Sequence, residues 1–373
     1  MEEFHPSSND TTASNSSSAL SAIRIIEIIL YLFISLTGIT ANGMIFHTLL
    51  RRNTLRIGEY LILNLAITDT ATCVISIPFD LAERLAGGFP FGSILCFLVY
   101  PLQTILMAVS VITLLSMSLE RRRIVMKALR PRVQPKKAKV AICISWVVPT
   151  LVIIPYALVL RLDGESCSEN WSEQWHVKVF TLSNFSLFFV IPIAVIASSY
   201  IMAGKKLTQE LQRLDNMLEG NERSRSQYIK KRTLQKLKVT RVFVKAVVAF
   251  FFCMLPTHLV WIWHDFAQGK QCKHFKDILI FANILMYLNS ALNPFIFRSV
   301  RGKSFTRYLS CCCKAFSENS SSSLLPMRCV SAPHTDITAV ERERAIRVSR
   351  QSYCRSSNEL QNCGVRNSYE TNV

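Results

Sequence analysis

The chain has 373 residues, half of them apolar, and a formal charge of +18 from 43 Lys and Arg against 25 Asp and Glu. Apolar residues and cations stand in separate blocks, and several blocks carry no charge over the roughly 20 residues that a helix needs to cross a bilayer. This separation argues against a single soluble core. Residues 1–22 are polar and lack the apolar run of a cleaved signal peptide, so we expect the first apolar block to act as an uncleaved signal anchor.

Seven apolar blocks follow along the chain. They cover residues 28–50, 60–82, 93–119, 140–160, 179–204, 246–263 and 278–297. Alternating strands of a barrel are absent from the sequence, and backbone polar groups cannot stay unpaired in lipid. The sequence therefore predicts an all-α membrane protein, a bundle of seven transmembrane helices. The basic stretch 230–245 precedes the sixth block, so we expect its helix to extend into the cytoplasm.

The distribution of Lys and Arg predicts the orientation. Cations crowd the loops after the first and third blocks, and residues 205–245 hold twelve more, whereas residues 161–178 carry four acids against two cations. Because cytoplasmic loops are rich in Lys and Arg, we expect an extracellular N-terminus and a multi-pass protein of the plasma membrane. The basic runs flank the spans and lack stacking aromatics, so we expect no nucleic-acid partner.

Glycosylation sequons agree with this orientation. They stand at Asn9, Asn15 and Asn170, in segments predicted to be extracellular.

Four polar residues inside the predicted spans need a reason to be there. Asp69 is the acid deep in the second block, Ser110 lies in the third, and Asn289 and Asn293 share one face of the seventh helix. An ionisable group in lipid costs at least ~2.5 kcal/mol, so Asp69 must face the bundle interior. The four side chains can hold a small cation or waters, or they can join helices as polar contacts; spacing alone leaves both readings open.

Three cysteines are predicted to be extracellular. Cys96 begins the third helix, Cys167 lies in the acidic loop, and Cys272 lies in the last external loop. A disulfide between Cys96 and Cys167 would pin the acidic loop over the bundle in the oxidising compartment. Counting cysteines does not fix the pairing, and Cys272 is the one that this pairing leaves over.

Prolines in or near the spans, at positions 149, 155, 192, 256 and 294, remove backbone hydrogen bonds and can open a central cavity. We expect bulky and polar side chains to line its outer half as ligand-binding residues, although each one alone can equally be ordinary helix packing. The expected ligand-binding residues are Phe79, Gln103, Met107, His258, Trp261, Asn283 and Tyr287.

Taken together, these landmarks make residues 25–312 resemble the rhodopsin-like (class A) G-protein-coupled receptors. The motifs are G-I-T-A-N ending at Asn42, N-L-A-I-T-D ending at Asp69, Cys96, Glu120-Arg121-Arg122, Trp146, Cys167, Pro192 with Tyr200, F-F-F-C-M-L-P ending at Pro256, and N-S-A-L-N-P-F-I-F from Asn289 to Phe297. Every helix carries its landmark in order.

The resemblance implies a receptor and not an enzyme, with heterotrimeric G proteins and arrestin as partners. It favours an allosteric sodium ion at Asp69, Ser110, Asn289 and Asn293, and it implies no other metal or cofactor. It also implies that Arg121 engages the G protein when the sixth helix swings outward. The implied coupling and activation residues are Glu120, Arg121, Tyr200, Met254, Pro256, Asn293, Pro294 and Phe297.

Three positions depart from the family pattern. Met254 replaces the usual Trp, Phe297 the Tyr of Asn-Pro-x-x-Tyr, and Arg122 the Tyr of Asp-Arg-Tyr. Residues 230–241 contain no acid that could restrain Arg121. We therefore expect an altered basal equilibrium, of unpredicted sign.

The ligand class follows from similarity. Receptors for amines carry an Asp where Gln103 stands, and visual pigments carry a Lys where Tyr287 stands, so both ligand classes are disfavoured. Gln103, the acidic loop and the basic third internal loop look most like neuropeptide receptors of the galanin, orexin and neuropeptide Y kind. Six external acids would attract a cationic peptide, or they form only a solvated rim, since exposed charge pairs contribute little. They are Asp80, Glu83, Asp163, Glu165, Glu169 and Glu173. A receptor for a lipid or small metabolite is the alternative within the class, and a transporter the alternative outside it.

The organisation predicted along the chain has four parts: a glycosylated N-terminus (1–24), the seven-helix domain (25–298), an interfacial helix with palmitoylated cysteines (299–313), and a disordered cytoplasmic tail (314–373). The palmitoylation sites are Cys311, Cys312 and Cys313. The final E-T-N-V, with Thr371 and Val373, matches the pattern of a ligand for a PDZ scaffold.

Overall fold

The computed structural model describes residues 9–127, 135–217, 223–267, 269–272 and 274–298. Side chains of the first helix are described from residue 23. The predicted interfacial helix, the three palmitoylation sites and the tail with its C-terminal motif lie outside the described residues and stay predictions.

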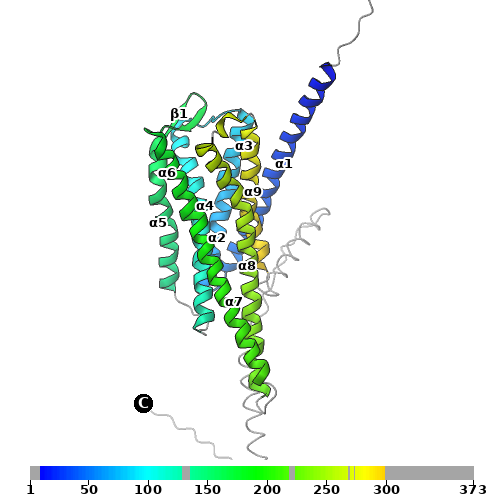
Figure 1. The fold of residues 1–373 in the computed structure, drawn as a ribbon, viewed down its shortest axis with the longest axis vertical. Coiled ribbons are helices and arrows are strands. Elements are labelled where there is room, and N and C mark those ends of the chain that lie inside the picture. Colours follow the sequence, from blue (N-terminus) through cyan, green and yellow to red (C-terminus); the bar gives the residue numbers. More distant parts are fainter. Residues whose placement is uncertain (1–8, 128–134, 218–222, 268, 273, 299–373) are drawn as a thin grey trace, which may run out of the picture. The chain divides into compact units, whose positions relative to one another are not determined.

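The described chain is a bundle of long helices with one small hairpin (Figure 1). The elements are α1 (Asn9–Leu50), α2 (Ile57–Ala71), α3 (Ile77–Ala86), α4 (Gly92–Met126), α5 (Pro135–Val159), β1 (Leu160–Asp163), β2 (Ser166–Glu169), α6 (Gln174–Phe185), α7 (Ile191–Met217), α8 (Arg223–Phe266) and α9 (Phe275–Arg298). Single π-helical turns join α2 to α3 at Thr72–Ser76 and α6 to α7 at Ser186–Val190. Each of these pairs therefore forms one continuous span.

Seven spans in the described part of the chain are long and apolar enough to cross a membrane, which confirms the predicted all-α fold. They are Ile23–Leu50, Ile57–Ala86, Gly92–Met126, Pro135–Val159, Gln174–Asn216, Gln227–Phe266 and Phe275–Phe297. Several reach further than the apolar blocks, because a helix continues through charged residues once it leaves the bilayer. The sixth span does so most clearly, since α8 runs for 44 residues. The first helix likewise begins at Asn9, inside the stretch predicted to be an N-terminal extension.

Local chemistry sets the ends of the second span. At its start the backbone N–H of Arg56 donates to Glu59 Oε2 at 2.8 Å, which satisfies a donor that the first turn would leave free. At its outer end Gly87 adopts φ 77°, a left-handed conformation that glycine takes without a steric cost. The chain can therefore turn directly into the short loop before α4.

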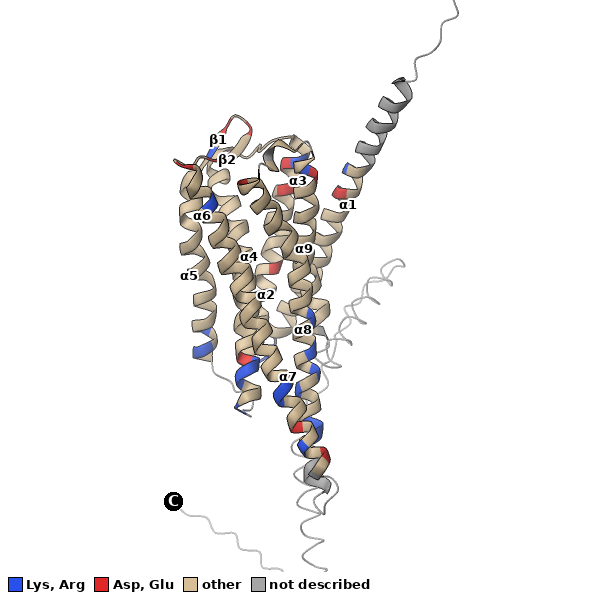
Figure 2. Ribbon diagram, viewed as in Figure 1, with Lys and Arg blue, Asp and Glu red and all other residues tan. Residues whose placement is uncertain are grey.

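Charge is divided between the two ends of the bundle. Figure 2 shows Lys and Arg gathered at the lower ends of α4, α5, α7 and α8, while Asp and Glu gather around α3 and the hairpin at the other end. This division agrees with the positive-inside orientation.

The external loop after α5 is a two-stranded antiparallel hairpin, which was not predicted from the sequence. Its register pairs Leu160 with Glu169 and Asp163 with Ser166, and Gly164 turns with φ 62°. A disulfide joins Cys167 on β2 to Cys96 at the start of α4, which confirms the predicted bridge. Cys272 forms no disulfide with any described residue.

The largest apolar core lies toward the cytoplasmic half, where α2, α4, α7 and α8 pack together. The largest side chains with under 2% exposure there include Phe250 and Phe297. A smaller core joins α1 to α9 near the outer half. There Gly38 permits close packing, because a Cβ at that position would lie 2.3 Å from the sulfur of Cys73.

Candidate functional site

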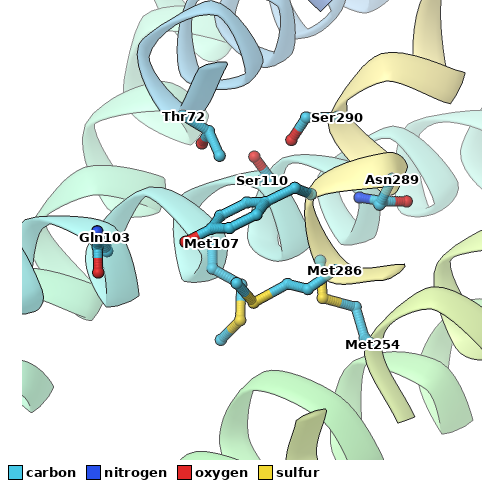
Figure 3. Close-up of a pocket in the computed structure, with 9 residues that line it drawn as sticks. Thr72, Gln103, Met107, Ser110, Met254, Met286, Asn289 and Ser290 are labelled. Atoms are coloured by element: carbon cyan, nitrogen blue, oxygen red, sulfur yellow. The ribbon is translucent and has the colours of Figure 1, made fainter. Parts of the chain in front are cut away.

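A small cavity opens between α4, α8, α9 and the π-helical turn Thr72–Ser76 (Figure 3). Its lining combines three thioethers with hydroxyl and amide groups: Thr72, Gln103, Met107, Ser110, Met254, Met286, Tyr287, Asn289 and Ser290. Gln103, Met107 and Tyr287 were predicted to bind ligand, and Ser110 and Asn289 to bind sodium. The cavity thus connects the two predicted sites, with Met254 at the position where the family usually has Trp.

Asp80 forms hydrogen bonds to two other helices near the outer end of this cavity. Its Oδ1 accepts a hydrogen bond from Gln103 Nε2 at 2.8 Å, and its Oδ2 accepts one from the hydroxyl of Tyr287 at 2.5 Å. The carboxylate thereby links α3, α4 and α9. In the described part of the chain, Asp80 forms no ion pair. A half-buried carboxylate held only by neutral donors keeps most of its charge uncompensated.

Glu83, one turn further out on α3, has a similar environment. Its Oε2 accepts a hydrogen bond from the hydroxyl of Tyr100 at 2.6 Å. The adjacent Arg84 forms ion pairs with two other acids. Its Nη2 lies 2.6 Å from Glu27 Oε2 and 3.6 Å from Asp277 Oδ1. The Arg84 cluster (Glu27, Arg84 and Asp277) therefore joins α1, α3 and α9 at the outer rim and leaves Asp80 and Glu83 without a cation from Arg84.

The other four predicted ligand-binding residues do not line the cavity. The ring of Phe79 lies 4.5 Å from that of Phe91, and His258 packs on Phe189 at 4.9 Å. Trp261 is 38% exposed and contacts His264 edge-on. Asn283 is half-buried on α9. Their role in ligand binding stays a prediction.

The predicted sodium residues are all buried and are partly connected. Asn293 Nδ2 donates to Asp69 Oδ2 at 2.9 Å, while Ser110 Oγ lies 3.0 Å from Thr68 Oγ1. In the described part of the chain, Asp69 Oδ1 and Asn289 Nδ2 have no hydrogen-bond partner. An unpartnered buried carboxylate oxygen is costly, and it is also the ligand type that a hard cation prefers. The residues therefore fit a small cation.

Arg121 lies at the cytoplasmic end of α4. It forms no ion pair with any described residue, and its guanidinium carbon lies 4.9 Å from the centroid of the Phe243 ring on α8. Glu120 pairs instead with Arg123, at 2.9 Å. Phe297 is 1% exposed and packs against Phe243 at 5.1 Å.

Several of these contacts were missed from the sequence. Asp80 was expected only as one of six external acids that would attract a cationic peptide, and its contacts with Gln103 and Tyr287 were not predicted. Phe243 belongs to no motif that the sequence singled out. Trp146 was recognised as a family landmark, but its hydrogen-bond partners were not predicted. Its Nε1 donates to Asn64 Oδ1 at 3.0 Å, and Asn64 Nδ2 donates to Thr113 Oγ1 at 2.8 Å. A polar residue in each of three apolar blocks was the available signal for this contact between α2, α4 and α5.

Residues 41–297 match the family model of the 7 transmembrane receptor (rhodopsin family). The chain belongs to this family. It is therefore a class A G-protein-coupled receptor, a multi-pass protein of the plasma membrane and not an enzyme.

Curated relatives include the neuropeptide Y receptor type 2 of Cavia porcellus, which is 24% identical over 295 residues that span 75% of this chain and 74% of the relative. The receptor of the same name from Sus scrofa is 25% identical with the same coverage. Neuropeptide FF receptor 2 of Mus musculus is 25% identical over 288 residues, which span 72% of this chain and 67% of the relative.

Proposed function

We propose that this receptor is activated by a basic neuropeptide and passes the signal to heterotrimeric G proteins through outward movement of α8, the sixth transmembrane helix. The names of its relatives, receptors for neuropeptide Y and neuropeptide FF, support a peptide ligand. The observation that carries the basic character is Asp80, a half-buried carboxylate that accepts hydrogen bonds from the neutral side chains of Gln103 and Tyr287 and has no ion pair among the described residues.

A cationic group of the peptide would gain more binding free energy at Asp80 than at the exposed acids of the rim. An ion pair in a partly desolvated site is stronger than one at an exposed rim, where charge pairs contribute little. Glu83, held by the hydroxyl of Tyr100, would add attraction one turn further out. The ligand's cation would share Asp80 with its two neutral donors, so that binding changes contacts on α3, α4 and α9 together.

The test is a G-protein dissociation assay in cells expressing the chain, with a neuropeptide library and parallel lipid and amine panels. A basic peptide should activate the receptor, and Arg121→Ala should silence it. Asp80→Asn keeps the shape but removes the charge, and it should lower the potency of that peptide about tenfold or more. Asp163→Asn, at an exposed acid of the hairpin, is the matched control and should leave the potency nearly unchanged. Activation by a lipid or an amine alone would overturn the proposal.

We propose that sodium binds at Asp69 with Ser110, Asn289 and Asn293 and stabilises the resting receptor. The unpartnered oxygen of Asp69 supports this, since a cation would satisfy it. Agonist potency should then fall as sodium replaces a larger cation at constant ionic strength. Asp69→Asn should remove that dependence, and a dependence that survives the substitution would contradict the site.

The cytoplasmic partners rest on the sequence alone. We propose arrestin as a partner of the activated receptor, palmitoylation at Cys311, Cys312 and Cys313, and a PDZ scaffold that binds the terminus at Thr371 and Val373. A Val373→Asp receptor that captures the same PDZ proteins as wild type would contradict the scaffold.

A further inference from the structure

Arg121, the residue placed to engage the G protein, lacks an ionic restraint in the described part of the chain. The adjacent carboxylate of Glu120 is engaged by Arg123, whose Nε lies 2.9 Å from Glu120 Oε2. The facing stretch 230–241 of α8 contains no acid. Among the described residues, no carboxylate forms an ion pair with Arg121, so we infer that its restraint there comes from another kind of group.

The aromatic ring of Phe243 on α8 lies beside the guanidinium of Arg121. The guanidinium carbon of Arg121 lies 4.9 Å from the centroid of Phe243, within the range at which a cation is attracted to the face of a ring. On another side lies Gly58 of α2, where a Cβ would be 4.0 Å from Arg121 Nη2. The guanidinium thus has neighbours on α2 and α8, and Tyr200 of α7 also interacts with it electrostatically. Phe243 is a contact on α8, the helix that is proposed to move.

Two further rings fix the orientation of Phe243. Tyr200 of α7 stacks on it at 6.2 Å with an interplanar angle of 20°, and Phe297 of α9 packs at 5.1 Å with an angle of 56°. Phe243 itself is 3% exposed. A buried ring held from two helices keeps its face toward Arg121 with little loss of side-chain entropy. The aromatic cluster (Tyr200, Phe243 and Phe297) also gives the departure at position 297 a role, because Phe supplies the ring without a hydroxyl to satisfy.

We propose that Phe243 is a positioning residue that holds Arg121 in the resting receptor by a cation–π contact, in place of an ion pair between α4 and α8. When α8 moves outward, the ring leaves and the guanidinium is freed to meet the G protein. This inference goes beyond the proposed function, since it requires neither the identity of the ligand nor that of the G protein.

Ordinary packing is the competing explanation, because a buried Phe would stabilise this core whatever lay beside it. The two explanations differ in one physical property. A cation–π contact depends on the negative face of the ring, which fluorine substituents weaken stepwise, whereas packing depends on size, which fluorine changes little. A series of fluorinated phenylalanines at position 243 therefore separates them.

The experiment uses the purified full chain in lipid nanodiscs without ligand, with mono-, di- and trifluorophenylalanine introduced at position 243. The melting temperature should fall stepwise, by about 2 °C in total. The same series in an Arg121→Met background should produce no stepwise fall, because the cation is gone. Phe252, on the same helix but 65% exposed, is the matched site at which the series should have no effect. Equal shifts at both sites, or equal shifts with and without Arg121, would overturn the proposal.

A second measurement links the contact to signalling. Agonist-free G-protein dissociation per surface receptor should rise about two- to fivefold in Phe243→Leu, because the resting state loses its restraint. A basal signal that stays at the wild-type level would overturn the proposal. If the wild-type receptor couples to no G protein under any agonist, the proposed function fails, while the melting series still decides the role of Phe243.

Discussion

The two halves of this receptor are held together by different chemistry. In the outer half, a disulfide joins strand β2 to α4, and the Arg84 cluster and the carboxylate of Asp80 join separate helices through polar groups. The inner half joins helices through rings and apolar side chains around Arg121. A polar network needs specific partners and geometry, whereas apolar packing tolerates sliding. The outer half is thus suited to recognising a ligand and the inner half to moving.

The largest effect is expected when the disulfide of the outer half is removed. Cys96→Ser removes a bridge between residues 71 apart in the sequence and should cost about 2–5 kcal/mol of stability, together with ligand binding at the unpinned hairpin. Thermal unfolding of the purified receptor measures the loss. Cys272→Ser is the control, since Cys272 lies in an external loop but in no described disulfide. Equal melting temperatures for the two variants would refute a stabilising role for the bridge.

A smaller effect should follow from breaking the Arg84 cluster. Arg84→Met leaves Glu27 unpaired, and the side chain of Glu27 is only 11% exposed, so the expected cost is about 1–3 kcal/mol. Arg52→Met is the matched control, because Arg52 and Glu59 form a more exposed pair, with side chains 41% and 24% exposed, that contributes about 0–1 kcal/mol. If both substitutions lower the melting temperature equally, burial does not distinguish the outer cluster.

The smallest effect concerns the inner half. Phe297→Tyr adds a hydroxyl beside Phe243 in a nearly fully buried position, and an unsatisfied hydroxyl costs about 1 kcal/mol or more in the resting state. Basal signalling should therefore rise, by about fivefold, in a G-protein dissociation assay normalised to surface expression. This assigns a sign that the sequence could not give. A basal signal that falls or does not change would contradict it.

The length of the apolar blocks and the loop charge were sufficient to predict the seven spans and their orientation. The bridge between Cys96 and Cys167 was expected from the external positions of both residues, and the structure confirms it. The basic stretch 230–245 also predicted that α8 would extend beyond the membrane into the cytoplasm. The hairpin escaped prediction because β1 and β2 span only four residues each, and their pairing depends on a turn and a disulfide. The extension of α1 to Asn9 was also not predicted, because its first residues are polar. Polar residues can continue a helix once an apolar segment has nucleated it.

Within the candidate site, the sequence identified single residues and the tertiary structure decided their partners. Gln103 and Tyr287 were two independent expectations, yet both donate to Asp80. Asp69 had to face inward because lipid tolerates no lone carboxylate, but only the packing of α9 on α2 brings Asn293 to it. The bilayer dictates span, direction and burial from composition alone. Which side chains meet depends on helix rotation and crossing. These follow from packing between segments far apart in the sequence, such as those of Asn42 and Ser290, which are 248 residues apart.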